Sequence, residues 1–282
     1  MTLVVGYAPD GRRRAVLHLA GMLARSASDD VVLCAVVPSP WPPSPARVDA
    51  EYRAHVEGEA AEVLEEARGR IGEDIEVSTL VHHARSVPAG LLEVAEQRDA
   101  SVLVTGAQGS TTNRLLHSSH VPVALAPRGF RVAPGARVQR VTAAFGGSGD
   151  DLVVAAGAVA GQVGAKLRIA SFAVRPRPPY TAGVGREADD SAIAEWVAEI
   201  QAAQQEALDR VRELPSVPPD CEAVVGRGET WEHALDDLEW ETGDVLVVGS
   251  STIGPVARVF LGSRSEKIVQ HSPVPVVVVP RG

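Results

Sequence analysis

Val245–Gly249, with the sequence VLVVG, is the stretch that decides the fold, because it has a close copy earlier in the chain. The copy is Val102–Gly106, VLVTG, and each run is followed by a second apolar run that contains an early proline. Those second runs are Val121–Ala126, VPVALA, and Val274–Val279, VPVVVV. A repeat of this length indicates two copies of one domain, because solenoid units are only a few tens of residues long.

The openings of the two halves match as well, since Leu3–Tyr7 corresponds to Val141–Phe145. We therefore expect one domain over residues 1–129 and a second over residues 138–282 of the 282-residue chain. Each half is long enough to bury its own core. Arg128–Arg137 contains Gly129, Pro134 and Gly135, and we interpret it as a short linker between docked domains.

Both halves alternate short Val-rich runs with longer helical patterns, which is typical of a parallel sheet covered by helices on both faces. The fold class we predict is α/β, with two tandem doubly wound domains. The expected strands are Leu3–Gly6, Val31–Val37, Ile75–Val81, Val102–Thr105, Val121–Ala126, Val138–Ala144, Lys166–Phe172, Glu222–Val225, Val245–Val248 and Val274–Val279. The expected helices are Arg13–Ser26, Tyr52–Ile71, Val87–Glu96, a stub at Thr112–His117, Asp151–Val163, Ala192–Leu214, Thr230–Glu241 and Val256–Gln270.

The last strand of each half is apolar and uncharged, so as a sheet edge it needs a partner. Val121–Ala126 and Val274–Val279 offer each other that partner. We expect the two domains to pair within one chain through these strands, giving a compact monomer or a homodimer built through another surface. The proline-rich stretches Pro38–Pro45 and Pro176–Gly185 are either lids over a ligand or solvated connections.

Composition excludes several classes of partner. The net charge is −9, which argues against a nucleic-acid partner, because binding a phosphate backbone needs a basic surface. No apolar run approaches the roughly 18 residues that span a bilayer, so no membrane partner is expected. The chain enters a strand pattern at once, without a leader, and its two cysteines, Cys34 and Cys221, have no metal-ligand spacing. We expect a cytoplasmic protein.

Two glycine-rich loops of the second half carry the candidate chemistry. Gly249–Gly254 contains Ser250, and seven residues after it come Gly262, Ser263, Arg264 and Ser265. Small residues allow a phosphate to approach the backbone, and N–H groups at a helix start point toward it. The alternative is turn glycines with a serine N-cap. The loop after the first strand of this half, with Phe145, Gly146 and Gly147, would meet Gly249 at the topological switch of the sheet, where ligands bind.

These residues resemble the universal stress protein family over essentially the whole chain. Its ATP-binding members carry Gly, two residues, Gly, nine residues, then Gly followed by Ser or Thr. Here Gly249 and Gly262–Ser263 match, whereas Thr252 replaces the middle glycine. The resemblance implies a five-stranded parallel sheet in the order 3-2-1-4-5, and a stress-response role with ATP, with or without Mg²⁺, as the ligand. Its implied contacts are Phe145, Gly146, Gly147, Phe172, Gly249, Ser250, Gly254, Gly262, Ser263, Arg264 and Ser265.

The first half departs further from that pattern. It keeps Gly106 and Gly109, but the following stretch is shorter, and we expect no Gly–Ser pair and only a stub for its fourth helix. The family places an Asp after the first strand, where the second half has Gly146 and the first has either Ala8 or Asp10. We therefore expect one adenine-nucleotide site, in the second half.

No enzyme class fits. Gly147–Leu152 departs from the dinucleotide motif, Phe145–Asp150 departs from the pyrophosphatase loop, and no Walker A loop exists. The histidines form no metal or catalytic constellation, so we expect neither catalysis nor a bound metal of the protein's own. The alternative to nucleotide binding is a scaffold or interaction protein of the same fold, in which both sites have decayed.

Overall fold

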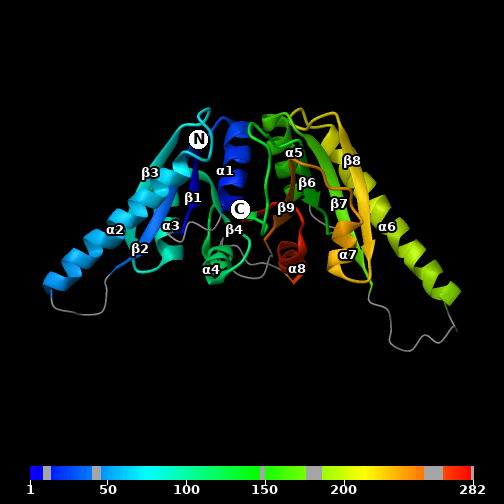
Figure 1. The fold of residues 1–282 in the computed structure, drawn as a ribbon. Coiled ribbons are helices and arrows are strands. Elements are labelled where there is room, and N and C mark those ends of the chain that lie inside the picture. Colours follow the sequence, from blue (N-terminus) through cyan, green and yellow to red (C-terminus); the bar gives the residue numbers. More distant parts are fainter. Residues whose placement is uncertain (9–13, 40–45, 147–149, 176–185, 251–262, 281–282) are drawn as a thin grey trace. The chain divides into compact units, whose positions relative to one another are not determined.

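The computed structural model describes residues 1–8, 14–39, 46–146, 150–175, 186–250 and 263–280 (Figure 1). Its contacts divide the chain into two compact units. The first contains residues 1–137, 250–262 and 275–282, and the second contains residues 138–249 and 263–274.

The first unit alternates strands and helices, as the hydrophobic pattern predicts. Its elements are β1 (Thr2–Gly6), α1 (Arg14–Ala27), β2 (Asp30–Pro38), α2 (Ala46–Arg68), β3 (Val77–Ala84), α3 (Val87–Gln97), β4 (Ala100–Gly106), α4 (Ser110–Ser118), β5 (Val123–Ala126) and β10 (Val276–Val279). The first five strands are parallel and lie in the order β3-β2-β1-β4-β5, which confirms the predicted 3-2-1-4-5 sheet.

Helices cover both faces of this sheet. Right-handed crossovers place α1 and α2 on one face, because both lead toward β3, and place α3 on the other, because it leads back to β4. α3 and α4 contact each other. The interior between these layers is apolar, and Val4, Leu91, Leu103 and Leu115 are at most 1% exposed. Val-rich strands that are buried on both faces explain the unbroken apolar runs of the sequence.

The second unit repeats this plan. Its elements are β6 (Arg140–Ala144), α5 (Asp151–Val163), β7 (Lys166–Val174), α6 (Arg186–Arg212), β8 (Cys221–Gly228), α7 (Trp231–Asp236), β9 (Asp244–Gly249) and α8 (Ser263–His271). Its strands are parallel and follow the order β8-β7-β6-β9, which matches β3-β2-β1-β4. α5 and α6 contact each other, and so do α7 and α8.

The strand that closes the second repeat belongs to the first unit. β10 runs antiparallel to β5, with Val276 opposite Leu125 and Val278 opposite Val123. Val123 and Val278 are fully buried, so the expected pairing partner of this apolar edge is present. That two whole domains pair within one chain, or that the chain forms a homodimer, stays a prediction.

Equivalent hydrogen bonds show how closely the repeats match. Ser119 Oγ donates to Val121 O at 2.6 Å, and Ser272 Oγ donates to Val274 O at 2.8 Å. Each serine thereby closes the turn between a helix and the Pro that starts the last strand. The repeated sequence therefore specifies a repeated turn.

Several helices differ at their ends from the sequence prediction. Residues 256–262 of the helix expected at Val256–Gln270 lie outside the described residues, and α8 is described over Ser263–His271. α2 and α6 begin at Ala46 and Arg186, six residues before the expected starts. The added turns are rich in charged residues, and they lack the apolar periodicity that marked the rest. None of the helices in the described residues is both long and apolar enough to cross a membrane.

α7 is shorter than expected and ends at Asp236 instead of Glu241. The chain leaves the helix because its next groups have other partners. The Glu239 carbonyl accepts hydrogen bonds from Arg140 Nη2 and Arg168 Nη1, both at 2.9 Å, and Trp240 Nε1 donates to Leu235 O at 2.7 Å. Tertiary hydrogen bonds therefore override the helical pattern here.

Candidate functional site

The expected nucleotide loops of the second unit follow two neighbouring strands. β6 and β9 are parallel and in register, with Ala143 beside Val247, so their carboxyl ends lie at the same edge of the sheet. From β6 the chain crosses through α5 toward β7, whereas β9 lies on the other side of β6. This divergence of connections is the topological switch at which open α/β sheets bind ligands.

The loop after β6 starts with Phe145, whose backbone is fixed on both sides. Its N–H donates to Ala170 O at 2.8 Å, and its carbonyl accepts from Ser171 Oγ at 2.9 Å. Gly146 follows and is exposed, and a Cβ built there meets none of the described residues within 4 Å. In the first unit Tyr7 N–H donates to Cys34 O in the same way, which aligns Ala8, rather than Asp10, with Gly146.

The carboxyl end of β9 is tied to the start of α8. Ser265 Oγ donates to Gly249 O at 3.1 Å. In the first unit Thr112 Oγ1 donates to Gly106 O at 2.7 Å, and Thr112 is likewise the third residue of its helix. A hydroxyl has one proton to donate, so a phosphate would compete with Gly249 O for that of Ser265. Both repeats use this hydroxyl to hold a helix start against a strand end.

The remaining residues of this set differ in exposure. Ser263 and Arg264 start α8 and are exposed, as an anion-binding helix start requires. Ser250 is 2% exposed, and its N–H donates to Val279 O at 3.0 Å. Gly147, Gly254 and Gly262 lie outside the described residues.

An aromatic pair stands at the carboxyl end of β7. Phe172 and Trp231, the first residue of α7, have ring centroids 6.1 Å apart and planes inclined by 50°. Both rings are partly exposed. Phe172 belongs to the site residues predicted from the sequence, whereas Trp231 does not. The sequence feature that could have pointed to Trp231 is its place directly after Thr230, a helix-capping residue that follows a predicted strand. In the structure Thr230 Oγ1 caps α7 by accepting from His233 N at 3.2 Å.

A carboxylate near the β6 loop already has a partner. Asp150 precedes α5, and its two oxygens accept from Arg210 Nε and Nη2 at 2.6 and 3.0 Å. The hydrogen bond and charge of Arg210 lower the pKa of Asp150, against a smaller effect of desolvation. Asp150 therefore serves as an ion-pair partner to α6 and does not replace the Asp that the family places after the first strand.

The first repeat is less degenerate than its sequence suggested. α4 has nine residues, the same number as α8, so the expected stub at Thr112–His117 was wrong. Thr111 and Thr112 continue a helix that begins at Ser110, with Gly109 before it at φ 120°. The pair Gly109–Ser110 thus stands where Gly262–Ser263 stands in the second repeat. The repeats differ instead in the connection, which has three residues, 107–109, against thirteen, 250–262.

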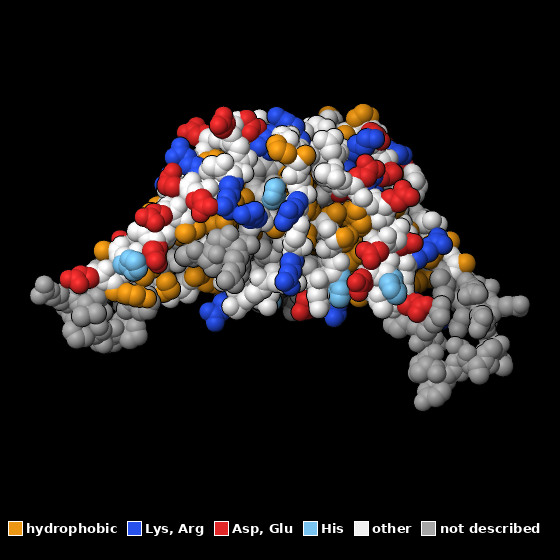
Figure 2. All heavy atoms as spheres, in the orientation of Figure 1, with side chains coloured by type: hydrophobic (Ala, Val, Ile, Leu, Met, Phe, Trp, Pro, Cys, Tyr) orange, Lys and Arg blue, Asp and Glu red, His pale blue; other side chains and the backbone are white. Residues whose placement is uncertain are grey.

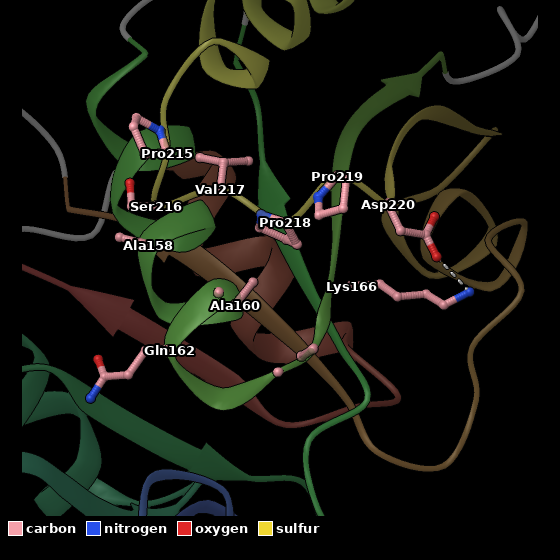
Figure 3. Close-up of a pocket in the computed structure, with 13 residues that line it drawn as sticks. Ala158, Ala160, Gln162, Lys166, Pro215, Ser216, Val217, Pro218, Pro219 and Asp220 are labelled. Carbon is pink, nitrogen blue, oxygen red and sulfur yellow. Dashed lines mark ion pairs between the residues drawn. The ribbon is translucent and has the colours of Figure 1, made fainter.

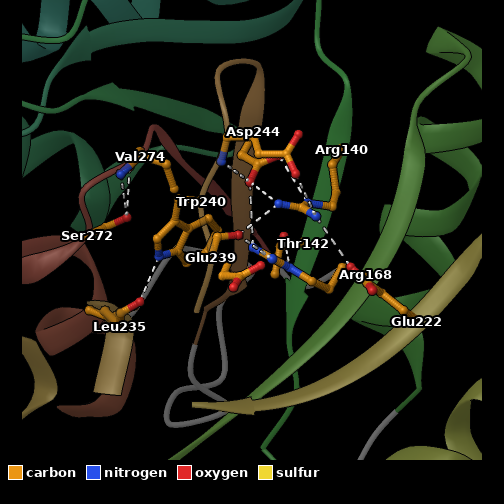
Figure 4. A network of polar contacts seen from close by, with 11 residues as sticks. Arg140, Thr142, Arg168, Glu222, Leu235, Glu239, Trp240, Asp244, Ser272 and Val274 are labelled. Carbon is orange, nitrogen blue, oxygen red and sulfur yellow. Dashed lines mark hydrogen bonds and ion pairs between the residues drawn. The ribbon is translucent and has the colours of Figure 1, made fainter. Parts of the chain in front are cut away.

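The amino ends of the second unit's strands hold two further features, neither of them near these loops. One is a surface cavity of about 660 Å³ between the end of α5 and the segment Pro215–Asp220, with the Lys166–Asp220 ion pair at its rim (Figure 3). The other is a buried ionic network of Arg140, Arg168 and Asp244 (Figure 4). Arg168 Cζ also lies 4.5 Å from the centroid of the Trp240 ring. Because both lie at the amino ends of the strands, they do not belong to the candidate site at the carboxyl ends.

Metal ligands do not gather in the described part of the chain, where no group of three or more His, Cys, Asp or Glu side chains could hold a metal ion. The adjacent histidines point to separate partners, as expected for neighbours in a strand. His82 pairs with Glu93 at 2.9 Å and His83 with Glu57 at 3.1 Å.

Two tandem doubly wound repeats, each with a loop-to-helix junction at the carboxyl end of its fourth strand, define the class of this protein as a Rossmann-like α/β protein. The model of the universal stress protein family matches residues 1–127 and again residues 138–280. The chain belongs to that family.

Known proteins of this family are similar in sequence or in structure to the chain. It is 41% identical, over 298 aligned residues, to a universal stress protein of Mycobacterium tuberculosis, with 99% of this chain and 100% of the relative covered. A universal stress protein of Thermus aquaticus is 30% identical over 116 residues, which cover 41% of this chain and 78% of the relative. The crystal structure of a universal stress protein from Archaeoglobus fulgidus has the same fold, with a TM-score of 0.62 and 20% identity over 100% of this chain and 98% of that one.

Proposed function

We propose that this chain is a cytoplasmic stress-response protein that binds an adenine nucleotide, ATP, in its second repeat and catalyses no defined reaction. The nucleotide would lie at the carboxyl ends of β6 and β9. The single observation that carries the proposal is the meeting of the Phe145–Gly146 loop and Gly249 at the topological switch, beside the exposed first turn of α8.

The chemistry of these residues suits a phosphate chain. The first turn of α8 offers backbone N–H groups, and Ser263 and Arg264 add a hydroxyl donor and a positive charge. A Mg²⁺ ion needs no protein cage here, because it can be held by the phosphates and water. Gly249 has no side chain to keep a ligand away from the strand end.

Phe172 and Trp231 support the assignment of the base. An adenine ring prefers offset or edge contacts with aromatic rings, and the partly exposed pair offers such a surface beside the strand ends. Phe145, 7% exposed, contributes its backbone rather than its ring.

The alternative function is that of a scaffold or interaction protein of the same fold without a nucleotide. The observation in its favour is Gly146, which supplies no carboxylate where the family has Asp, while the neighbouring Asp150 is bound to Arg210. In that case the loops would be ordinary turns and the second repeat would bind no phosphate.

The deciding experiment is to denature the purified chain and analyse the supernatant for adenine nucleotide by chromatography, followed by calorimetric titration of the nucleotide-free protein with Mg-ATP. We expect released nucleotide or saturable binding. Neither released nucleotide nor heat of binding at millimolar ATP would refute the proposal and leave the scaffold alternative.

Two glycine variants locate the site. A Cβ on Gly249 would lie 3.6 Å from Leu152 Cδ2, an ordinary contact, so Gly249→Ala should leave the fold intact. We expect this variant to lose ATP affinity, because the methyl group occupies the face on which the phosphate approaches. Gly58→Ala, in α2 of the first unit, where a Cβ meets no described residue within 4 Å, is the control and should bind as before. Equal affinity in both variants would place the ligand elsewhere.

Gly146→Asp tests the same site by a gain of affinity. It supplies the carboxylate that the family carries, at a position where a Cβ meets none of the described residues within 4 Å. One charge-assisted hydrogen bond to the ribose contributes about 1.5 kcal/mol, or roughly ten-fold in the dissociation constant. A drop in ATP affinity in Gly146→Asp would contradict the assignment of this loop to the ribose.

A further inference from the structure

A second concave site lies in the first unit, at the carboxyl ends of β4 and β5. It is a cavity of about 430 Å³ between the start of α1, the residues after β4, and the segment that follows β5. The lining residues that matter here are Arg14, Gly106, Gln108, Arg128, Phe130 and Arg131. This cavity lies in the first unit and shares no residue with the candidate site of the second repeat, so it is a separate site.

The lining is strongly basic. Three of its residues are the exposed arginines Arg14, Arg128 and Arg131, and none of the described residues that line it is acidic. Within the described residues these three guanidinium groups form no ion pair. The chain as a whole has a net charge of −9. Three cations without an ion pair among the described residues therefore create a local positive potential around this cavity.

The electrostatic surroundings of His18 indicate the same concentration of positive charge. His18 lies one turn after Arg14 in α1, and its pKa is lowered by burial, by the charge of Arg131 and by that of Arg14, against a hydrogen bond with the Val132 backbone. Arg14 and Arg131 are far apart in the sequence, but both lie close enough to His18 to affect its pKa. In Figure 2, Lys and Arg side chains gather beside a histidine in the region that α1 occupies in Figure 1.

We propose that this cavity binds a small molecule with a phosphate group. Guanidinium groups bind phosphate oxygens in a bidentate manner, and two or three of them around one point suit a group with two negative charges better than a single carboxylate. The backbone N–H groups at the start of α1 favour the same charge. Phe130 and Val16 give the cavity an apolar wall, which suits an organic phosphate.

Titration of the full chain with inorganic pyrophosphate, followed by calorimetry and by NMR of the His18 ring, tests this proposal. We expect saturable binding and a rise in the pKa of His18, because the bound anion offsets the charges of Arg131 and Arg14. Arg131→Gln and Arg14→Gln should each weaken binding roughly ten-fold, through the loss of charge-assisted hydrogen bonds. Arg98→Gln, an exposed arginine outside the cavity, is the matched control and should bind as before.

The Gly249→Ala variant separates this site from the proposed nucleotide site. We expect it to keep its pyrophosphate affinity, so the cavity can be confirmed even if the second repeat binds no ATP. Three results would each overturn the proposal: unchanged affinity in the Arg14→Gln/Arg131→Gln double variant, an equal loss in Arg98→Gln, or a His18 pKa that stays constant at saturating pyrophosphate.

Discussion

Replacing Asp244 by Asn should destabilise the second unit more than a typical surface change, because Asp244 is the only negative charge at the centre of a buried ionic network among the residues described (Figure 4). Its side chain is 1% exposed, and those of Arg140 and Arg168 are 14% and 3% exposed. Register creates the network, since Arg140 lies opposite Asp244 across β6 and β9, and Thr142 lies opposite Arg168 across β6 and β7.

The size of the effect follows from the contacts that are lost. Asp244 accepts from Arg140 Nε at 3.1 Å, from Arg140 Nη2 at 2.6 Å and from Glu241 N at 2.9 Å, and Arg168 Nη2 lies 3.7 Å from Oδ2. That Arg168 nitrogen has no hydrogen bond to any described residue. Burial and the charge of Arg140 lower the pKa of Arg168, and among the carboxylates that oppose them Asp244 acts most strongly, ahead of Glu222 and Glu241. Removing one partner of a buried pair costs about 3–5 kcal/mol, and we expect that range for Asp244→Asn.

Urea denaturation followed by circular dichroism measures the loss of stability. Hydrogen exchange of peptides from β6 and β9 assigns it to the second unit, because two units need not unfold together. Asp220→Asn is the matched control, since Asp220 is 65% exposed and pairs with Lys166 at 2.9 Å. An exposed pair of this kind contributes about 0–1 kcal/mol.

A second substitution checks the physical cause. In the Asp244→Asn background, Arg140 keeps as ion-pair partners among the described residues only the exposed carboxylates of Glu222 and Glu241, at 3.4 and 3.9 Å. Arg140→Met should therefore cost less there than it does alone, and the difference is a coupling energy. A loss below about 1 kcal/mol for Asp244→Asn, or a loss equal to that of Asp220→Asn, would refute the argument that this carboxylate balances two buried arginines.

Two further predictions concern single residues. Cys34 is 1% exposed, and burial raises the pKa of its thiol to about 12, so the thiol stays protonated at pH 9. In a Cys221→Ser background, iodoacetamide should therefore label Cys34 only after denaturation. Labelling of the native protein would contradict this. Gly164 follows α5 with φ 69°, and a Cβ there meets none of the described residues within 4 Å, so Gly164→Ala should cost about 1 kcal/mol from backbone strain alone. Gly58→Ala within α2 should instead stabilise the protein by roughly 0.5–1 kcal/mol. Thermal shifts of the same sign in the two variants would refute that account.

The sequence was sufficient for the architecture because the repeat and the Val-rich runs are strong local signals. α5 begins at Asp151 and ends at Val163 as expected, since its apolar period is regular and Gly164 follows it. The end of α7 was not predictable, because it depends on Arg140 and Arg168, which come from other strands. Local periodicity contains no information about such distant hydrogen-bond donors.

The site was predictable only in part, and the comparison of Ser265 with Thr112 shows why. Both hydroxyls bind the carbonyl of a strand-end glycine, so a serine at the start of the fourth helix is first of all a structural contact that any repeat of this fold can use. Glycine–serine spacing therefore predicts the junction between strand and helix, and only secondarily a phosphate. What differs between the repeats is the length of the connection before that helix, three residues against thirteen. The ligands proposed for the two repeats therefore rest on other features, which are the arginines around the cavity after β5 in the first repeat and the topological switch between β6 and β9 in the second.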